Sequence, residues 1–78
     1  MPTVLRVGPY RFFFYSRENN EPPHIHVERD DATGKFWLDP IALASSRGFR
    51  SHELSELLTI VQANRALFLE RWREHFNR

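Results

Sequence analysis

The chain has 78 residues, of which 41% are hydrophobic and 14% aromatic, so it suits one small folded domain and is too apolar for a disordered tail. Cysteine is absent, which excludes disulfide bonds and thiolate zinc sites and favours a cytoplasmic protein. The net charge of +1 hides an uneven distribution, with three arginines and no acid in residues 1–17 and five acids in residues 18–31, so we predict a locally basic surface.

The first half of the chain is predicted to form four short strands. Turn residues and runs of aromatic or β-branched residues place them at about 3–7, 10–16, 24–29 and 34–38. The second of these is aromatic on both faces, which is typical of a central strand. Pro40 ends the fourth strand, and residues 41–50 are predicted to be an irregular or briefly helical link.

Residues 51–76 are predicted to form one long helix. Ser51 is expected to cap its start, and Glu53 lies in the first turn, where the helix dipole favours an acid. Residues recur at steps of three and four in one broad stripe that is suited to packing on a sheet. The stripe consists of Leu54, Leu57, Leu58, Val61, Arg65, Phe68, Trp72, His75 and Phe76.

This helix is longer than the strands that it would cover. About 25 helical residues span about 37 Å, whereas strands of five or six residues span about 17–20 Å. The helix therefore overhangs the sheet, breaks near Asn64, or packs on another copy of the chain. Ile60 and Leu67 lie one heptad apart outside the stripe and favour a second contact surface, so we predict a homodimer through the C-terminal helix.

Together these elements predict a single α+β domain over residues 1–78. A small antiparallel sheet of three to five strands has the C-terminal helix packed on one face. No segment has the about 20 apolar residues that a membrane span requires, and the first residues do not resemble a signal peptide. We therefore expect no membrane association.

The most distinctive segment is residues 21–28, Glu-Pro-Pro-His-Ile-His-Val-Glu. Side chains alternate between the faces of a strand, so Ile25 and Val27 are expected to face the core while His24 and His26 share the opposite face. Two neighbouring imidazoles can bind a metal, move protons or contact a phosphate.

Other polar and aromatic residues are expected to join the two histidines. If the third and fourth strands form a hairpin, Lys35 and Trp37 share their face, and Arg11 or Arg6 can join from the first two strands. This mixture suits phosphate contact with base stacking. Arg47 and Arg50, which flank a glycine before the helix start, form a second candidate phosphate site.

Three interpretations of the histidine pair stay open. His24 and His26 act as acid and base in cleaving a phosphodiester, without metal or cofactor; or they only bind a ligand; or they are surface groups without function. A metal site is less favoured because ligands along one strand, with Glu28 as the third, are too far apart to converge. It would need a further ligand from elsewhere, such as Asp39, His52 or His75.

The chain resembles the bacterial domain-of-unknown-function family 4160. The resemblance rests on residues 1–6, 10–16, 21–27 and 35–40, on the Arg47-Gly48-Phe49 corner and on the long final helix. It implies the toxin half of a type II toxin–antitoxin pair, with a small antitoxin encoded nearby, and it singles out His24 and His26 with Lys35 and Trp37 as companions. We therefore expect a cytoplasmic toxin that acts on RNA through this face, with ribonuclease activity left open. The alternative is a non-catalytic module that binds nucleic acid or a protein partner.

Overall fold

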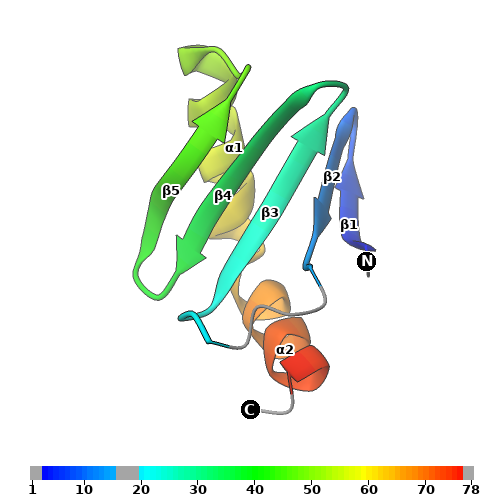
Figure 1. Ribbon diagram of the computed structural model, residues 1–78, viewed down its shortest axis with the longest axis vertical. Helices are drawn as coiled ribbons and strands as arrows, with labels where there is room; N and C mark the ends of the chain where they lie inside the picture. Colours follow the sequence, from blue (N-terminus) through cyan, green and yellow to red (C-terminus); the bar gives the residue numbers. More distant parts are fainter. Residues whose placement is uncertain (1–2, 16–19, 77–78) are drawn as a thin grey trace.

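A computed structural model describes residues 3–15 and 20–76 as a five-stranded sheet and two helices (Figure 1). Neighbouring strands are antiparallel and follow one another in chain order. The strands are β1 (Thr3–Val7), β2 (Tyr10–Phe13), β3 (His24–Arg29), β4 (Ala32–Leu38) and β5 (Ile41–Arg47). This confirms the predicted α+β fold.

β1 and β3 have the predicted bounds, whereas β2 and β4 differ from them. β2 ends at Phe13 because Phe14 leaves the ladder and packs against Trp72, with ring centroids 5.5 Å apart. The last residue of the strand predicted over 10–16, Ser16, lies outside the described residues. β4 begins at Ala32, earlier than predicted.

The prediction of an irregular link over residues 41–50 is wrong, since most of it is strand β5. It pairs with β4 from Leu38 opposite Ile41 to Thr33 opposite Arg47. The register shifts where Lys35 pairs with Ser45 and Phe36 with Leu43, which leaves Ala44 as an extra residue in a bulge. The bulge interrupts the alternation by which a strand is recognised in a sequence.

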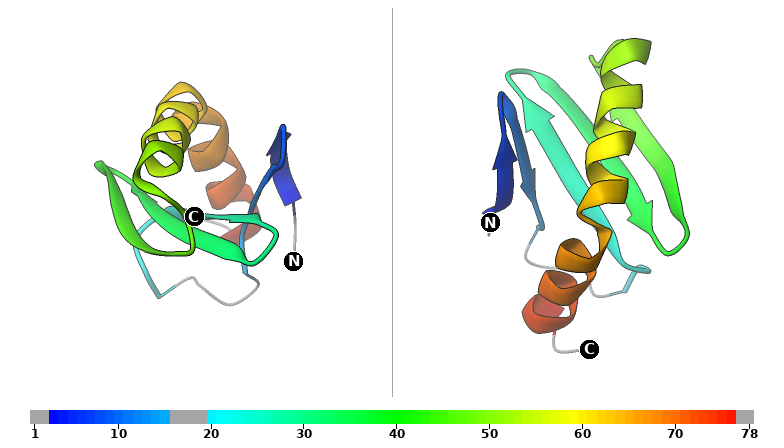
Figure 2. Two further views of the ribbon diagram at one scale, coloured as in Figure 1. Left: turned by 90° about the horizontal axis from the view of Figure 1, so that it is seen from above. Right: turned by 180° about the vertical axis from the view of Figure 1, so that it is seen from behind.

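The C-terminal half forms two helices, α1 (Ser51–Ala63) and α2 (Arg65–Phe76), and not the single helix predicted over 51–76. The break at Asn64 is one of the three outcomes that the length of this segment allowed. The side-chain amide of Asn64 donates a hydrogen bond of 2.9 Å to the Ile60 carbonyl, and its backbone is not helical. Such a bond competes with the backbone ladder of the helix. As a result, α1 crosses the sheet and α2 lies beyond its lower end (Figures 1 and 2).

The start of α1 differs from the prediction that Ser51 caps it. Ser51 is the first helical residue, and Arg50 occupies the cap position. The Arg50 N–H donates to Glu53 Oε1 at 3.0 Å, so the acid expected in the first turn does stabilise the helix start.

The core lies between the helices and one face of the sheet. Ile25 and Val27 are fully buried there, as their alternation predicts. The sheet also contributes Phe12, Phe36 and Leu38, and the helices contribute Leu57, Val61, Phe68, Leu69 and Trp72.

Ile60 and Leu67 do not form the separate contact surface that their spacing predicted. Both pack against the core, because the break at Asn64 changes the direction of the helix. The homodimer inferred from them stays a prediction. No helix of the described ranges is long and apolar enough to cross a membrane.

Candidate functional site

The face of the sheet away from the helices is the candidate site, and we call it the open face. α1 lies on the other face of the sheet (Figure 2), and α2 reaches this face at the start of β3, where Trp72 contacts His24. The strand register orders its side chains in rows across the sheet. The central row is Phe13, His26, Lys35 and Ser45; the rows on either side are Arg11, Glu28, Thr33 and Arg47, and His24, Trp37 and Ala42.

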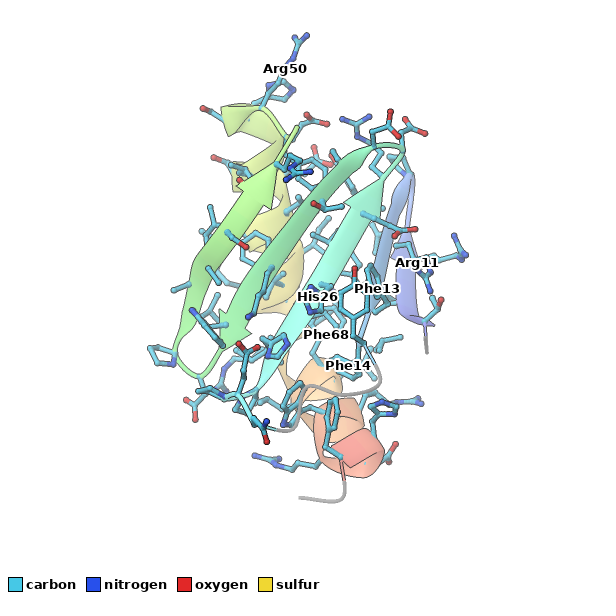
Figure 3. The ribbon with its side chains drawn as sticks, viewed as in Figure 1. Arg11, Phe13, Phe14, His26, Arg50 and Phe68 are labelled. Carbon is cyan, nitrogen blue, oxygen red and sulfur yellow. The ribbon has the colours of Figure 1, made fainter. Side chains whose placement is uncertain are left out.

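His26 lies in the middle of the open face and is partly exposed (Figure 3). Its ring stacks on Phe13 with centroids 5.6 Å apart, and it meets the ring of Tyr15 edge-on at 4.5 Å. Lys35 is its direct partner on β4. His26 is therefore held by aromatic contacts next to a cationic side chain.

His24 shares the face of His26 but is enclosed. Its side chain is fully buried, with the ring of Trp72 at 4.8 Å and that of Trp37 at 5.6 Å. Nδ1 donates a 2.9 Å hydrogen bond to the Pro22 carbonyl, which can only accept, and Nε2 lies 3.6 Å from a carboxylate oxygen of Glu21. The two histidines thus differ in accessibility: His26 is partly exposed, whereas His24 is fully buried.

Lys35 is held in place by two neighbours. Its Nζ lies 2.8 Å from Glu21 Oε1 and 4.5 Å from the centre of the Trp37 ring. The ion pair and the cation–π contact fix the ammonium above the open face. Lys35 and Trp37 thus accompany the histidines, as predicted.

A hollow of about 360 Å³ lies beside His26 and Lys35. Arg47 at the end of β5 forms one of its walls, and its side chain is exposed. Among the described residues, Arg47 has no ion pair. The lining residues are Tyr15, His26, Thr33, Gly34, Lys35, Ser45, Ser46 and Arg47.

The two remaining predicted binding residues lie apart from this hollow (Figure 3). Arg11 is on the open face, but its guanidinium pairs with Glu28 at 3.3 Å and lies over the Phe13 ring. Arg50 occupies the cap position at the N-terminal end of α1 and does not line the hollow (Figure 3). The predicted pair of Arg47 and Arg50 is therefore not a single site.

Five residues of the hollow, Tyr15, Thr33, Gly34, Ser45 and Ser46, were not predicted as site residues. Ser45 and Ser46 lie in the segment that was expected to be a link, and Tyr15 lies in the aromatic strand that was expected to be central. Tyr15 is in fact 43% exposed. Thr33 lies in β4, ahead of the start predicted for that strand. Only the polar end of β5, Ser-Ser-Arg, could have indicated a polar wall.

Two shifted pKa values lie near the start of α1, outside the open face. Burial, followed by the nearby carboxylates of Glu56 and Glu53, raises the pKa of Tyr10. The hydrogen bond from the Arg50 backbone lowers the pKa of Glu53, and Arg29, at 2.7 Å, lowers it further. These groups stabilise the junction of α1 with the sheet.

The positions of the acids and histidines give no metal centre within the described ranges. No group of three or more His, Asp or Glu side chains there is close enough to hold an ion. His52 lies in the first turn of α1 and His75 in the last turn of α2, at opposite ends of the helical layer. The extra ligands that were considered for His24 and His26 are therefore not assembled around them.

The fold and the open face define a class: a small α+β domain whose antiparallel sheet presents cations, hydroxyls and aromatic rings on the face opposite α1. The family model described as Domain of unknown function (DUF4160) matches residues 10–73. The chain belongs to this family, as the resemblance of its motifs indicated. No curated protein matches the chain, and no solved structure does.

Proposed function

We propose that this protein is the toxin-like component of a bacterial toxin–antitoxin pair and that its open face binds RNA. The observation that supports this is the grouping of Lys35 and Arg47 around a hollow that is walled by Tyr15. Cationic side chains contact the phosphates of single-stranded nucleic acid, and aromatic rings stack on its bases.

Binding is better supported than cleavage. Acid–base cleavage of a phosphodiester uses two proton-transferring groups on either side of the reacting phosphate. His26 is accessible, but His24 is enclosed by Trp72 and hydrogen-bonded to the Pro22 carbonyl. In this proposal the protein blocks its RNA target, and it needs neither a metal ion nor a cofactor.

The partner in this proposal is a small antitoxin encoded nearby. A partner segment that covers the open face would compete with RNA for the same cations and rings, which gives neutralisation a simple physical basis. Both components would act in the cytoplasm, where their RNA target is found.

The test is to induce the chain alone in a bacterium and to follow growth. The informative variant is Lys35→Gln/Arg47→Gln, which removes two positive charges from the hollow. Its matched control is Arg71→Gln/Arg73→Gln, which removes two exposed positive charges from α2. Circular dichroism and soluble yield establish that each variant folds.

The proposal predicts arrest by the wild-type chain and the control, and growth with the hollow variant. If the soluble wild-type chain causes no arrest, it is not a free-standing toxin. RNA binding without arrest would then favour the non-catalytic regulatory module. Equal arrest by all three proteins would keep the toxin and reject the open face as its site.

A further inference from the structure

The hollow on the open face has the size of a site for one small ligand. Its volume of about 360 Å³ is near the lower end of the range for ligand pockets, about 300–1,000 Å³. Most of its lining residues, among them His26, Lys35 and Arg47, belong to the open face. This size suits a single nucleotide unit.

The charges around the hollow suit a phosphate group. Lys35 uses one contact on Glu21 and one on the Trp37 ring, and an ammonium has three N–H donors, so a donor is left for an anion. Arg47 brings a planar guanidinium, which matches phosphate oxygens with two parallel hydrogen bonds. Glu28, the nearest acid along the rows, is paired with Arg11.

The aromatic and hydroxyl groups suit the rest of a nucleotide. Tyr15 lines the hollow and is 43% exposed, and an exposed aromatic ring can stack on a base. Ser45 shares the central row with Lys35 and places a hydroxyl near the cations.

We infer that the hollow is a single-nucleotide subsite, in which Lys35 and Arg47 hold the phosphate and the Tyr15 ring stacks on the base. The inference rests on the proposed function, because it assigns one unit of the RNA to a place on the open face. It goes further in naming which part of the nucleotide each side chain contacts.

The test is a titration of the ¹⁵N-labelled protein with adenosine 5′-monophosphate, followed by amide NMR spectra. Inorganic phosphate and adenosine are titrated separately as the two halves of the ligand. We expect saturable shifts at the backbone amides of Gly34, Ser45 and Ser46, which line the hollow. Each half should bind more weakly than the nucleotide and at the same amides.

Paired variants separate the two contacts. Arg47→Gln should weaken nucleotide and phosphate binding by about tenfold or more, because it removes charge-assisted hydrogen bonds. Arg73→Gln removes the same charge from α2 and should leave both affinities unchanged. Tyr15→Leu should weaken nucleotide binding by about fivefold or more without changing phosphate binding, whereas Tyr15→Phe retains the ring and the affinity.

The inference is overturned if millimolar nucleotide causes no saturable shift at the hollow, or if Arg73→Gln weakens binding as much as Arg47→Gln. Its failure is distinct from that of the proposed function. RNA that binds the open face without shifting these amides would overturn the subsite and leave RNA binding intact. Nucleotide binding at the hollow by a chain that does not arrest growth would support the subsite and count against the toxin.

Discussion

Replacing each histidine of the pair with alanine tests the contrast between the enclosed His24 and the accessible His26. The side chain of His24 is fully buried, and its Nδ1 hydrogen bond to Pro22 is 2.9 Å long. Losing this bond costs about 0.5–1.5 kcal/mol, and truncating a buried ring leaves a cavity that costs about 2 kcal/mol or more.

The net expectation for His24→Ala is a loss of about 2–3 kcal/mol in the free energy of unfolding. A domain of this size has about 4–12 kcal/mol in total, and the loss corresponds to a fall in Tm of about 10–20 °C. His26→Ala, on the same strand, removes a partly exposed ring and should cost about 1 kcal/mol or less.

Urea denaturation followed by tryptophan fluorescence measures both changes, with equal m-values as the check that the unfolding transition is comparable. If His24→Ala costs no more than His26→Ala, the argument that His24 is a structural residue is wrong. A large loss for His26→Ala alone would reverse the assignment of the two residues.

Three further changes test the framework that supports the open face. Arg65→Met should lower the free energy of unfolding, measured by urea denaturation, by about 1–2 kcal/mol. The reason is that Arg65 Nε donates a 2.8 Å hydrogen bond to the Leu38 carbonyl and so links α2 to the sheet. A loss near zero would contradict this. Gly48→Ala should lower the free energy of unfolding by about 1–3 kcal/mol, because Gly48 has φ +87° and an added Cβ would lie 3.2 Å from Ala32. An unchanged midpoint of urea denaturation would contradict this. The pKa of Glu53 is lower in the folded protein, so its contribution to stability is complete above the ordinary carboxyl pKa and is lost as the pH falls through the folded value. Glu53→Gln should therefore flatten the acid limb of a curve of stability against pH. An unchanged acid limb would refute this.

The face of each β3 side chain could be predicted because it depends only on alternation. Ile25 and Val27 are in the core, and the register places His26 beside Lys35. The length of the C-terminal segment likewise predicted a break near Asn64 as one of three outcomes. These predictions needed no knowledge of distant contacts.

The burial of His24 could not be predicted in this way. It depends on α2, which turns at Asn64 and brings Trp72 to the end of β3. Alternation gives the face of a residue, but contacts from distant parts of the chain decide whether that face is covered there.

The hollow was missed for a related reason. Its far wall is β5, whose bulge at Ala44 disrupts the period of two. Because no fifth strand was predicted, Arg47 was not placed near Lys35. It was grouped with Arg50 instead, since the two are close in the sequence.

The most direct test of RNA binding by the open face is the salt dependence of that binding. Labelled single-stranded RNA is titrated with the wild-type chain, Lys35→Gln/Arg47→Gln and Arg71→Gln/Arg73→Gln at several salt concentrations. If Lys35 and Arg47 each contact a phosphate, the slope of log Kobs against log salt concentration should become shallower by about 1.4 in the hollow variant, because each contact on a single strand contributes about 0.7. The α2 variant should keep the wild-type slope. Equal slopes for all three proteins, or an equal loss in the α2 variant, would contradict the open face as the RNA-binding surface.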